Sequence, residues 1–172
     1  MILRDAKGWA TRPVQRRETL KAGPPVQPAA SQACSVWAQS LDNYLNRKNS
    51  PMTGEGTNLM NSGQQYDLDP RLFVALAGAE TGFGKEITAG QYNAHNILYN
   101  GHNSPFSSFI AATNAAGHSL TNPKNRYDLS NTSTMYHTYC STGSTCGAGL
   151  KNVNAIMQEQ KADINSLHDP CN

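Results

Sequence analysis

The chain has 172 residues, of which 15% are charged and 38% hydrophobic, and its formal net charge is +2 at neutral pH. This length suits one domain with a hydrophobic core, or one domain with a terminal extension. The small charge, with no run of lysine and arginine interleaved with aromatic residues, argues against nucleic-acid binding. No apolar stretch approaches the roughly 20 residues that span a bilayer, so we expect no membrane span.

The first part of the chain is predicted to be a flexible leader, residues 1–32, and residues 33–172 one folded domain. The leader has scattered basic side chains, a stretch rich in proline, glycine and alanine, no amphipathic period, and no apolar segment typical of a secretory signal. Helical spacing of apolar residues then predicts a first helix of three turns, which ends at Asn49-Ser50-Pro51. Its expected apolar stripe is Val36, Trp37, Leu41, Tyr44 and Leu45.

The next two helices differ in the strength of their signals. Residues 56–66 predict a weak helix, because they contain an internal glycine. The third helix has the clearest start, since Asp69 can act as its N-cap and Pro70 suits the first helical position, where a missing N–H is harmless. We expect this helix to begin within a residue of Pro70.

The second half of the chain predicts a mixture of loop and helix. Residues 88–104 are rich in glycine and asparagine around a short apolar run, which favours a loop or small hairpin. Helices are expected over residues 105–120, near Tyr136, and over residues 150–167. The last helix should bury Leu150, Val153, Ile156, Met157 and Ile164. The predicted fold class is therefore mostly α, a helical domain with a small loop or hairpin region.

Glu80 lies near the end of the third helix and is followed by Gly82 and Gly84. It falls seven residues after Phe73, on the apolar stripe of the helix, so the carboxylate should be partly desolvated. Desolvation raises a carboxyl pKa, and an acid that stays protonated near neutral pH can protonate a departing sugar oxygen. The two glycines would leave room for a bulky substrate. On these residues alone, a Glu80 that caps the helix or pairs with a buried cation is at least as good an interpretation.

The segment YDLDPRLFVALAGAETGFGK, residues 66–85, resembles Y-G-[IV]-D-P-x-L-x-x-A-I-A-x-x-E-[ST]-x-F-G of the lysozyme-like superfamily. That superfamily includes lytic transglycosylases and glucosaminidases that cut bacterial cell-wall glycan. The likeness covers roughly residues 50–161, including YNAHNILY and MYHTYC. Two positions depart from the pattern of the superfamily. Thr81 stands where serine is commoner, and Ala94-His95-Asn96 lacks the aromatic-glycine pair often found at that point. The resemblance implies an α+β lysozyme-like fold, a glycan-binding cleft, and Glu80 as the catalytic acid/base.

The implied function is cleavage of β-1,4 bonds in an N-acetylated glycan, above all peptidoglycan, by a monomer without a cofactor. Hydrolysis normally uses two carboxylates. Asp128 and Glu86 are the nearest candidates by sequence for a second carboxylate beside Glu80. Asp128 equally suits a helix cap, and Glu86 equally suits a solvent-facing position. A hydrolase and a lytic transglycosylase, in which the substrate's own hydroxyl or acetamido group attacks, both stay open. The alternative from another class is a non-catalytic glycan-binding or virion/envelope structural module on the same fold.

Further polar residues are candidates for substrate contact. Tyrosines can stack on a sugar ring, and amide or imidazole groups can hold an N-acetyl group, although both residue types equally serve the core or their own turns. His95 and His102 lack the i, i+4 spacing of a zinc protease and have no glutamate between them, so we expect no metal. The candidate substrate-binding residues are Thr81, Asn93, His95, Asn96, Tyr136 and Tyr139.

The four cysteines form no Cys-x-x-Cys pair, which argues against a structural zinc site. In an oxidising compartment we expect Cys140 to pair with Cys146 across a short polar turn, and Cys34 with Cys171 near the two chain ends. Four buried free thiols are the alternative. The low charge and abundant asparagine, serine, threonine and glycine favour an extracellular, periplasmic or cell-wall-associated protein.

Overall fold

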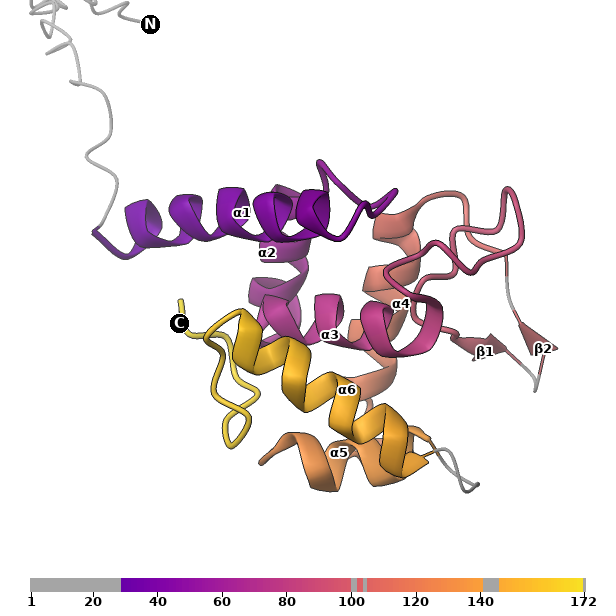
Figure 1. Cartoon of the computed structure of the whole chain (residues 1–172). Helices are drawn as coiled ribbons and strands as arrows, with labels where there is room; N and C mark the ends of the chain where they lie inside the picture. Colours follow the sequence, from indigo (N-terminus) through magenta and orange to yellow (C-terminus); the bar gives the residue numbers. More distant parts are fainter. Residues whose placement is uncertain (1–28, 100–101, 104, 141–145, 172) are drawn as a thin grey trace, which may run out of the picture.

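The fold is described by a computed structural model for residues 29–99, 102–103, 105–140 and 146–171 (Figure 1). Within these residues it is mostly helical, as the sequence predicts, with a small antiparallel hairpin that pairs Leu98 with Asn103 and Tyr99 with His102. The elements are α1 (Ala29–Arg47), α2 (Gly56–Tyr66), α3 (Pro70–Thr81), β1 (Leu98–Tyr99), β2 (His102–Asn103), α4 (Phe109–Thr121), the short 3₁₀ helix η1 (Pro123–Asn125), α5 (Thr132–Tyr139) and α6 (Cys146–Glu159).

Helix α3 is the central element, and it packs against α1, α2 and α6 (Figure 1). It is apolar on nearly all sides, the pattern of a helix enclosed by its neighbours, and residues 72–77 are all buried. The close contact with α6 depends on Gly78, because a Cβ there would lie 2.5 Å from Ile156. The apolar run in the sequence therefore becomes the core of the fold.

Both ends of α3 are set by local signals. The prediction for its start is confirmed: the Asp69 carboxylate accepts a hydrogen bond of 2.9 Å from the Arg71 backbone N–H, and Pro70 begins the helix. Its C-terminal cap is Gly82, whose φ of 56° lies in the left-handed region that glycine adopts without a Cβ clash. Glu80 is thus held in the last turn of a rigid, buried helix.

The predicted first helix is present but is longer than expected, because α1 begins at Ala29, before the predicted leader boundary. Residues 1–28 of that leader lie outside the described part of the chain. Leu41, Tyr44 and Leu45 are buried as predicted, whereas Val36 is 64% exposed. Val36 is one residue out of step with the stripe that α1 presents to its neighbours, so its side chain faces solvent.

The last two long helices differ from their predicted bounds. Helix α4 starts at Phe109 and not at residue 105, because the Ser108 hydroxyl caps it by accepting from the Ala111 N–H. Helix α6 spans Cys146–Glu159 and not residues 150–167. The chain leaves the helix at Lys161, where φ is 57°. Ile164 consequently lies outside the helix, and its backbone carbonyl accepts from the first residue of α5.

The predicted burial on α6 is confirmed for its central residues. Val153, Ile156 and Met157 are buried, whereas Leu150 is only partly buried at the edge of the core. In the part of the chain that the structure describes, no helix combines the length and apolar character needed to cross a membrane.

Candidate active site

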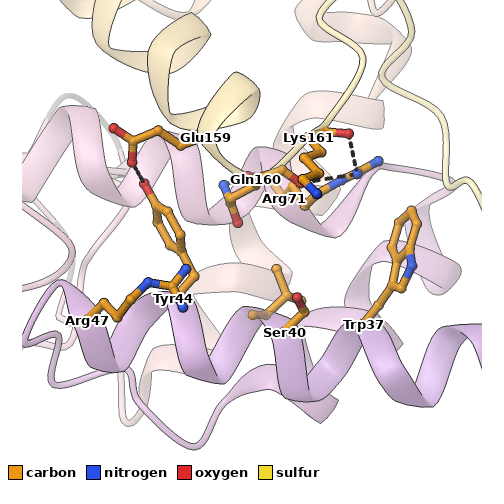
Figure 2. A pocket seen from close by; sticks show the side chains of 9 residues that line it. Trp37, Ser40, Tyr44, Arg47, Arg71, Glu159, Gln160 and Lys161 are labelled. Carbon is orange, nitrogen blue, oxygen red and sulfur yellow. Dashed lines mark hydrogen bonds between the residues drawn. The ribbon is translucent and has the colours of Figure 1, made fainter.

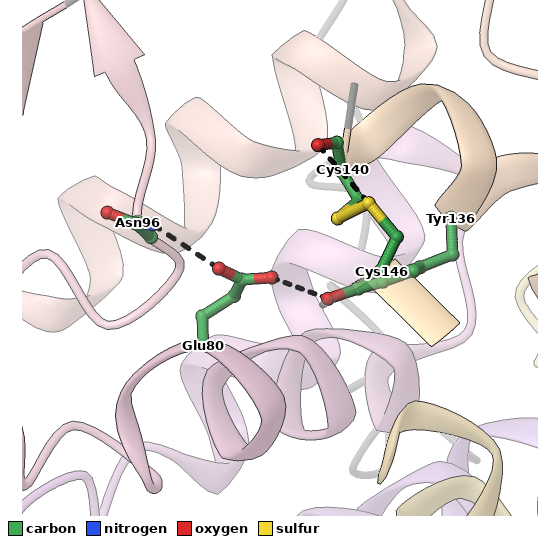
Figure 3. Close-up of a disulfide and its surroundings, with 5 residues drawn as sticks. All are labelled: Glu80, Asn96, Tyr136, Cys140 and Cys146. Carbon is green, nitrogen blue, oxygen red and sulfur yellow. Dashed lines mark hydrogen bonds between the residues drawn. A yellow bond between two sulfur atoms is a disulfide. The ribbon is translucent and has the colours of Figure 1, made fainter. Parts of the chain in front are cut away.

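The Glu80 carboxylate is half-buried and is held by two neutral side chains from distant parts of the chain (Figure 3). The Tyr136 hydroxyl of α5 donates to Oε1 at 2.8 Å, and the Asn96 amide donates to Oε2 at 3.3 Å. Among the described residues, no lysine, arginine or histidine forms an ion pair with Glu80. The carboxylate is therefore not the partner of a described buried cation, and the C-terminal cap of α3 is Gly82 and not Glu80.

Two tyrosines on α5 form the wall behind this carboxylate. The rings of Tyr136 and Tyr139 are stacked, with centroids 5.8 Å apart and planes 23° apart. The Tyr139 hydroxyl donates to the backbone carbonyl of His95. Burial raises the pKa of both phenols, and the nearby negative charge of Glu80 raises them further. Both hydroxyls thus stay protonated at physiological pH, and Tyr136 is a lasting hydrogen-bond donor to Glu80.

Two of the predicted substrate-binding residues instead support the loop that carries Asn96. Thr81 is buried, and its hydroxyl lies 2.7 Å from the Ala94 carbonyl, which ties the end of α3 to the loop. Asn93 is 2% exposed, and its amide bonds both the N–H and the carbonyl of Ile97 at 2.9 Å. These side chains close a turn in which Asn96 takes a φ of 51° and points toward Glu80. Of the predicted loop residues, Asn96 alone bonds Glu80 among the described contacts.

His95 is fully buried and is not a surface contact as the sequence suggests. Its ring packs edge-on against Phe73 of α3, with centroids 6.2 Å apart. Neither ring nitrogen makes a hydrogen bond of good geometry within the described residues. Burial lowers the pKa of His95 from 6.5 to about 4, against a smaller opposing effect of the Phe73 backbone. His95 is therefore neutral in the folded protein at neutral pH.

This buried histidine should make the stability of the protein depend on pH. The unfolded chain binds a proton at His95 near pH 6.5 and the folded chain only near pH 4, so the unfolded state binds more protons between these values. The free energy of unfolding should fall by about 3 kcal/mol through this group as the pH is lowered from 7 to 4. Urea unfolding of His95→Gln should show a flatter pH dependence than the parent. The exposed His118 offers a control, and equal slopes for His95→Gln and the parent would contradict this origin.

The predicted disulfide between Cys140 and Cys146 is present, with Cα atoms 5.7 Å apart. It joins the end of α5 to the start of α6, one residue after Tyr139 (Figure 3). Cys171 is also in a disulfide. Its predicted partner, Cys34, has a side chain outside the described residues, so that pairing stays a prediction. The short bridge fixes the segment that carries the two tyrosines.

The two other candidate carboxylates do not bond Glu80. Asp128 is exposed and accepts from the Ser130 N–H in the turn before α5, which lowers its pKa below the usual value. The helix cap at this point is Asn131, and not Asp128. Glu86 is exposed as predicted. Its side chain lies over Gly82, with Oε1 3.2 Å from the position that a Cβ on Gly82 would occupy. Neither carboxylate thus takes part in the described hydrogen bonds of Glu80, and the described residues contain no group of His, Cys, Asp or Glu side chains suited to a metal ion.

Gly149 is a residue of the site that the sequence did not indicate. A Cβ at this position of α6 would lie 2.2 Å from the Tyr136 hydroxyl oxygen, so only glycine allows the phenol to lie where it reaches Glu80. A glycine in the first turns of a helix has no distinctive sequence signal. Its role becomes visible only once α5 is placed against α6.

Comparisons of this chain with protein-family models, with curated proteins and with solved structures find no match. The lysozyme-like resemblance of residues 66–85 therefore stays a prediction. Support for a function comes from the chemistry of the groups that surround Glu80.

Proposed function

We propose that this protein is a lysozyme-like glycosidase that cleaves β-1,4 bonds in an N-acetylated glycan, peptidoglycan, with Glu80 as general acid and base. The observation that carries the proposal is a single half-buried carboxylate at the end of a rigid helix, fixed by the neutral donors Tyr136 and Asn96. A carboxyl group with no cationic partner is free to exchange a proton with a bound substrate. The resemblance of the surrounding segment supplies the substrate class.

The two oxygens of Glu80 have different tasks in this mechanism. Oε1 accepts the shorter hydrogen bond from buried Tyr136, whereas the described bond to Oε2 is the 3.3 Å one from exposed Asn96. We assign the transferable proton to Oε2. As it passes to the glycosidic oxygen, the bond from that oxygen to the anomeric carbon breaks and the leaving sugar departs as an alcohol. The Tyr136 and Asn96 donors stabilise the carboxylate that remains.

The attacking group restores the proton in the second half of the reaction. A retaining or inverting hydrolase uses a second carboxylate as nucleophile or base. No described residue is assigned as that second carboxylate, and we propose that a hydroxyl or acetamido group of the substrate itself attacks in its place, with its proton passing to Glu80. Attack by the sugar hydroxyl yields an anhydro sugar end without consuming water, which is the lytic transglycosylase reaction. Attack by water at the same site would give a reducing end.

Mass spectrometry of digested peptidoglycan tests this function directly. We expect new glycan ends whose mass is lower by one water molecule than that of hydrolytic products. New reducing ends instead would leave Glu80 as the acid but assign the reaction to a hydrolase. Unchanged glycan together with measurable binding would contradict catalysis and support a non-catalytic glycan-binding module on this fold.

The proposed location is outside the cytosol, in an extracellular, periplasmic or cell-wall compartment. The disulfide between Cys140 and Cys146 supports it, since such bonds persist mainly in oxidising environments. A peptidoglycan-cleaving enzyme would also meet its substrate there. The proposed partner is the polysaccharide alone, engaged by a monomer that needs no cofactor.

A further inference from the structure

A pocket of about 420 Å³ lies at the start of α3, between α1 and the end of α6 (Figure 2). Its lining contains none of the residues that bond Glu80. Arg71 in the lining lies in the first turn of α3 and Glu80 in its last turn, so about 14 Å of helix separates them at about 1.5 Å per residue. The pocket is therefore a separate feature of the surface, and the mechanism above makes no use of it.

One side chain of this pocket has a polar atom without a partner. The Gln160 Nε2 lies 3.2 Å from the Ile156 carbonyl and 3.3 Å from the Arg71 carbonyl, which fixes the orientation of the amide. Its Oε1 is buried and has no hydrogen-bond partner among the described residues. Figure 2 shows this oxygen facing α1 across the pocket. The oxygen exposes almost no surface, so a donor reaches it only after a small movement of the amide or its neighbours; a ligand with hydroxyl or N–H groups can then supply the bond, and an acceptor-only anion cannot.

The aromatic walls of the pocket are held rigidly. The Arg71 guanidinium stacks over Trp37 at 4.2 Å and is itself fixed by the Asp69 carboxylate at 2.6 Å. The Tyr44 hydroxyl donates to Glu159 Oε2 at 2.5 Å, and burial together with this bond raises the pKa of Tyr44. Tyr44 is 4% exposed, so the partly buried Trp37, which has Arg71 over one ring face, is the ring that a ligand in the pocket can contact. That combination suits the amphipathic faces of a sugar ring.

The rim of the pocket offers both donors and acceptors. Ser40 and Arg47 line it from α1, and Glu159 lines it from α6 (Figure 2). Such mixed side chains match sugar hydroxyl and acetamido groups, each of which both donates and accepts. A peptide ligand would instead use an unpaired strand edge or an apolar groove. The lining of this pocket includes no residue of β1 or β2.

We propose that this pocket is an accessory binding site for an N-acetylated sugar unit, with Gln160 Oε1 accepting from the sugar and Trp37 as the stacking surface. The choice of glycan rests on the proposed function. The site would hold one part of a polymer strand while another part reaches Glu80, and two linked contacts bind a strand more tightly than either alone.

The test follows the indole N–H signal of Trp37 by NMR while the full chain is titrated with a soluble tetramer of N-acetylglucosamine. The chain has two tryptophans, so Trp9→Phe leaves Trp37 as the only one, and Glu80→Gln prevents turnover during the titration. We expect a saturable shift. Ser40→Phe, which fills the pocket, should weaken this binding about three- to ten-fold, the loss expected for one aromatic stacking contact. Gln39→Phe adds the same ring to an exposed neighbouring position of α1 that does not line the pocket. This variant should bind the sugar tetramer as tightly as the protein without it.

The possible results separate this proposal from the catalytic one. A Trp37 shift that Ser40→Phe weakens supports the accessory site, even if the parent protein cleaves no glycan. If the Trp37 signal does not shift although the parent protein cleaves wall glycan, the accessory site is overturned and the role of Glu80 is left intact. A shift that Ser40→Phe does not weaken arises elsewhere and also overturns it. Saturation by the free wall tetrapeptide, but not by the sugar tetramer, would overturn it in favour of a peptide site.

Discussion

Replacing Glu80 with glutamine is expected to lower glycan cleavage by about 10²–10⁴-fold, the contribution typical of a positioned general acid. Glutamine has nearly the same shape, so the Tyr136 hydroxyl can still donate to its carbonyl oxygen, but an amide has no proton of suitable acidity for the leaving sugar. Release of new glycan ends from purified cell walls measures the loss. Because the side chain is only half-buried and forms no ion pair with a described residue, the folded state and glycan binding should be retained.

Glu86→Gln is the matched control for this substitution. Glu86 is an exposed carboxylate close to the end of the same helix, so its replacement changes the net charge of the protein equally without touching the Glu80 contacts. It should keep parental activity. Wild-type clearing of cell walls by Glu80→Gln would rule out Glu80 as the catalytic acid, whereas an equal loss in both variants would assign Glu86 as the second carboxylate of a hydrolase.

Replacing Gly149 with alanine is expected to give the second large effect, because it should push Tyr136 off the carboxylate. The added Cβ would lie 2.2 Å from the Tyr136 hydroxyl oxygen, far inside van der Waals contact, so either the phenol or α6 must move. We expect a stability loss of about 1–3 kcal/mol, typical of an overpacked core. Activity should fall at least about ten-fold if the Tyr136 bond holds Glu80 in place.

Gly147 provides a control in the same helix, since nothing lies within 4 Å of a Cβ built there. Gly147→Ala should therefore leave activity unchanged and raise stability by up to about 1 kcal/mol, the usual preference for alanine over glycine in a helix. Chemical unfolding and cleavage rates of both variants provide the comparison.

A double-mutant cycle separates the steric cause from a general weakness of α6. Tyr136→Phe removes the oxygen nearest the new Cβ, so Gly149→Ala should destabilise the Tyr136→Phe protein less than it destabilises the parent. Equal destabilisation in the two backgrounds would contradict the proposed clash. Parental activity of Gly149→Ala would show that the Tyr136 hydroxyl does not position Glu80.

The sequence by itself determined the features that depend on neighbours a few residues away. Asp69 and Pro70 set the start of α3 because a cap and a fixed φ act within one helical turn. The apolar run of α3 then placed Glu80 in its last turn, because helical periodicity propagates along a short chain segment. The bridge between Cys140 and Cys146 was predictable for the same reason, since the two thiols flank a short turn.

Only the tertiary structure decided which polar groups meet at Glu80. Asn93, His95 and Asn96 look alike in the sequence, yet the first closes its own turn, the second is buried, and the third reaches the carboxylate. Tyr136 meets Glu80 from 56 positions away along the chain. Such contacts depend on how α5 packs against α6 and on the left-handed backbone at Asn96. Local periodicity and capping do not encode these long-range arrangements, because they arise from the packing of separate elements into one core.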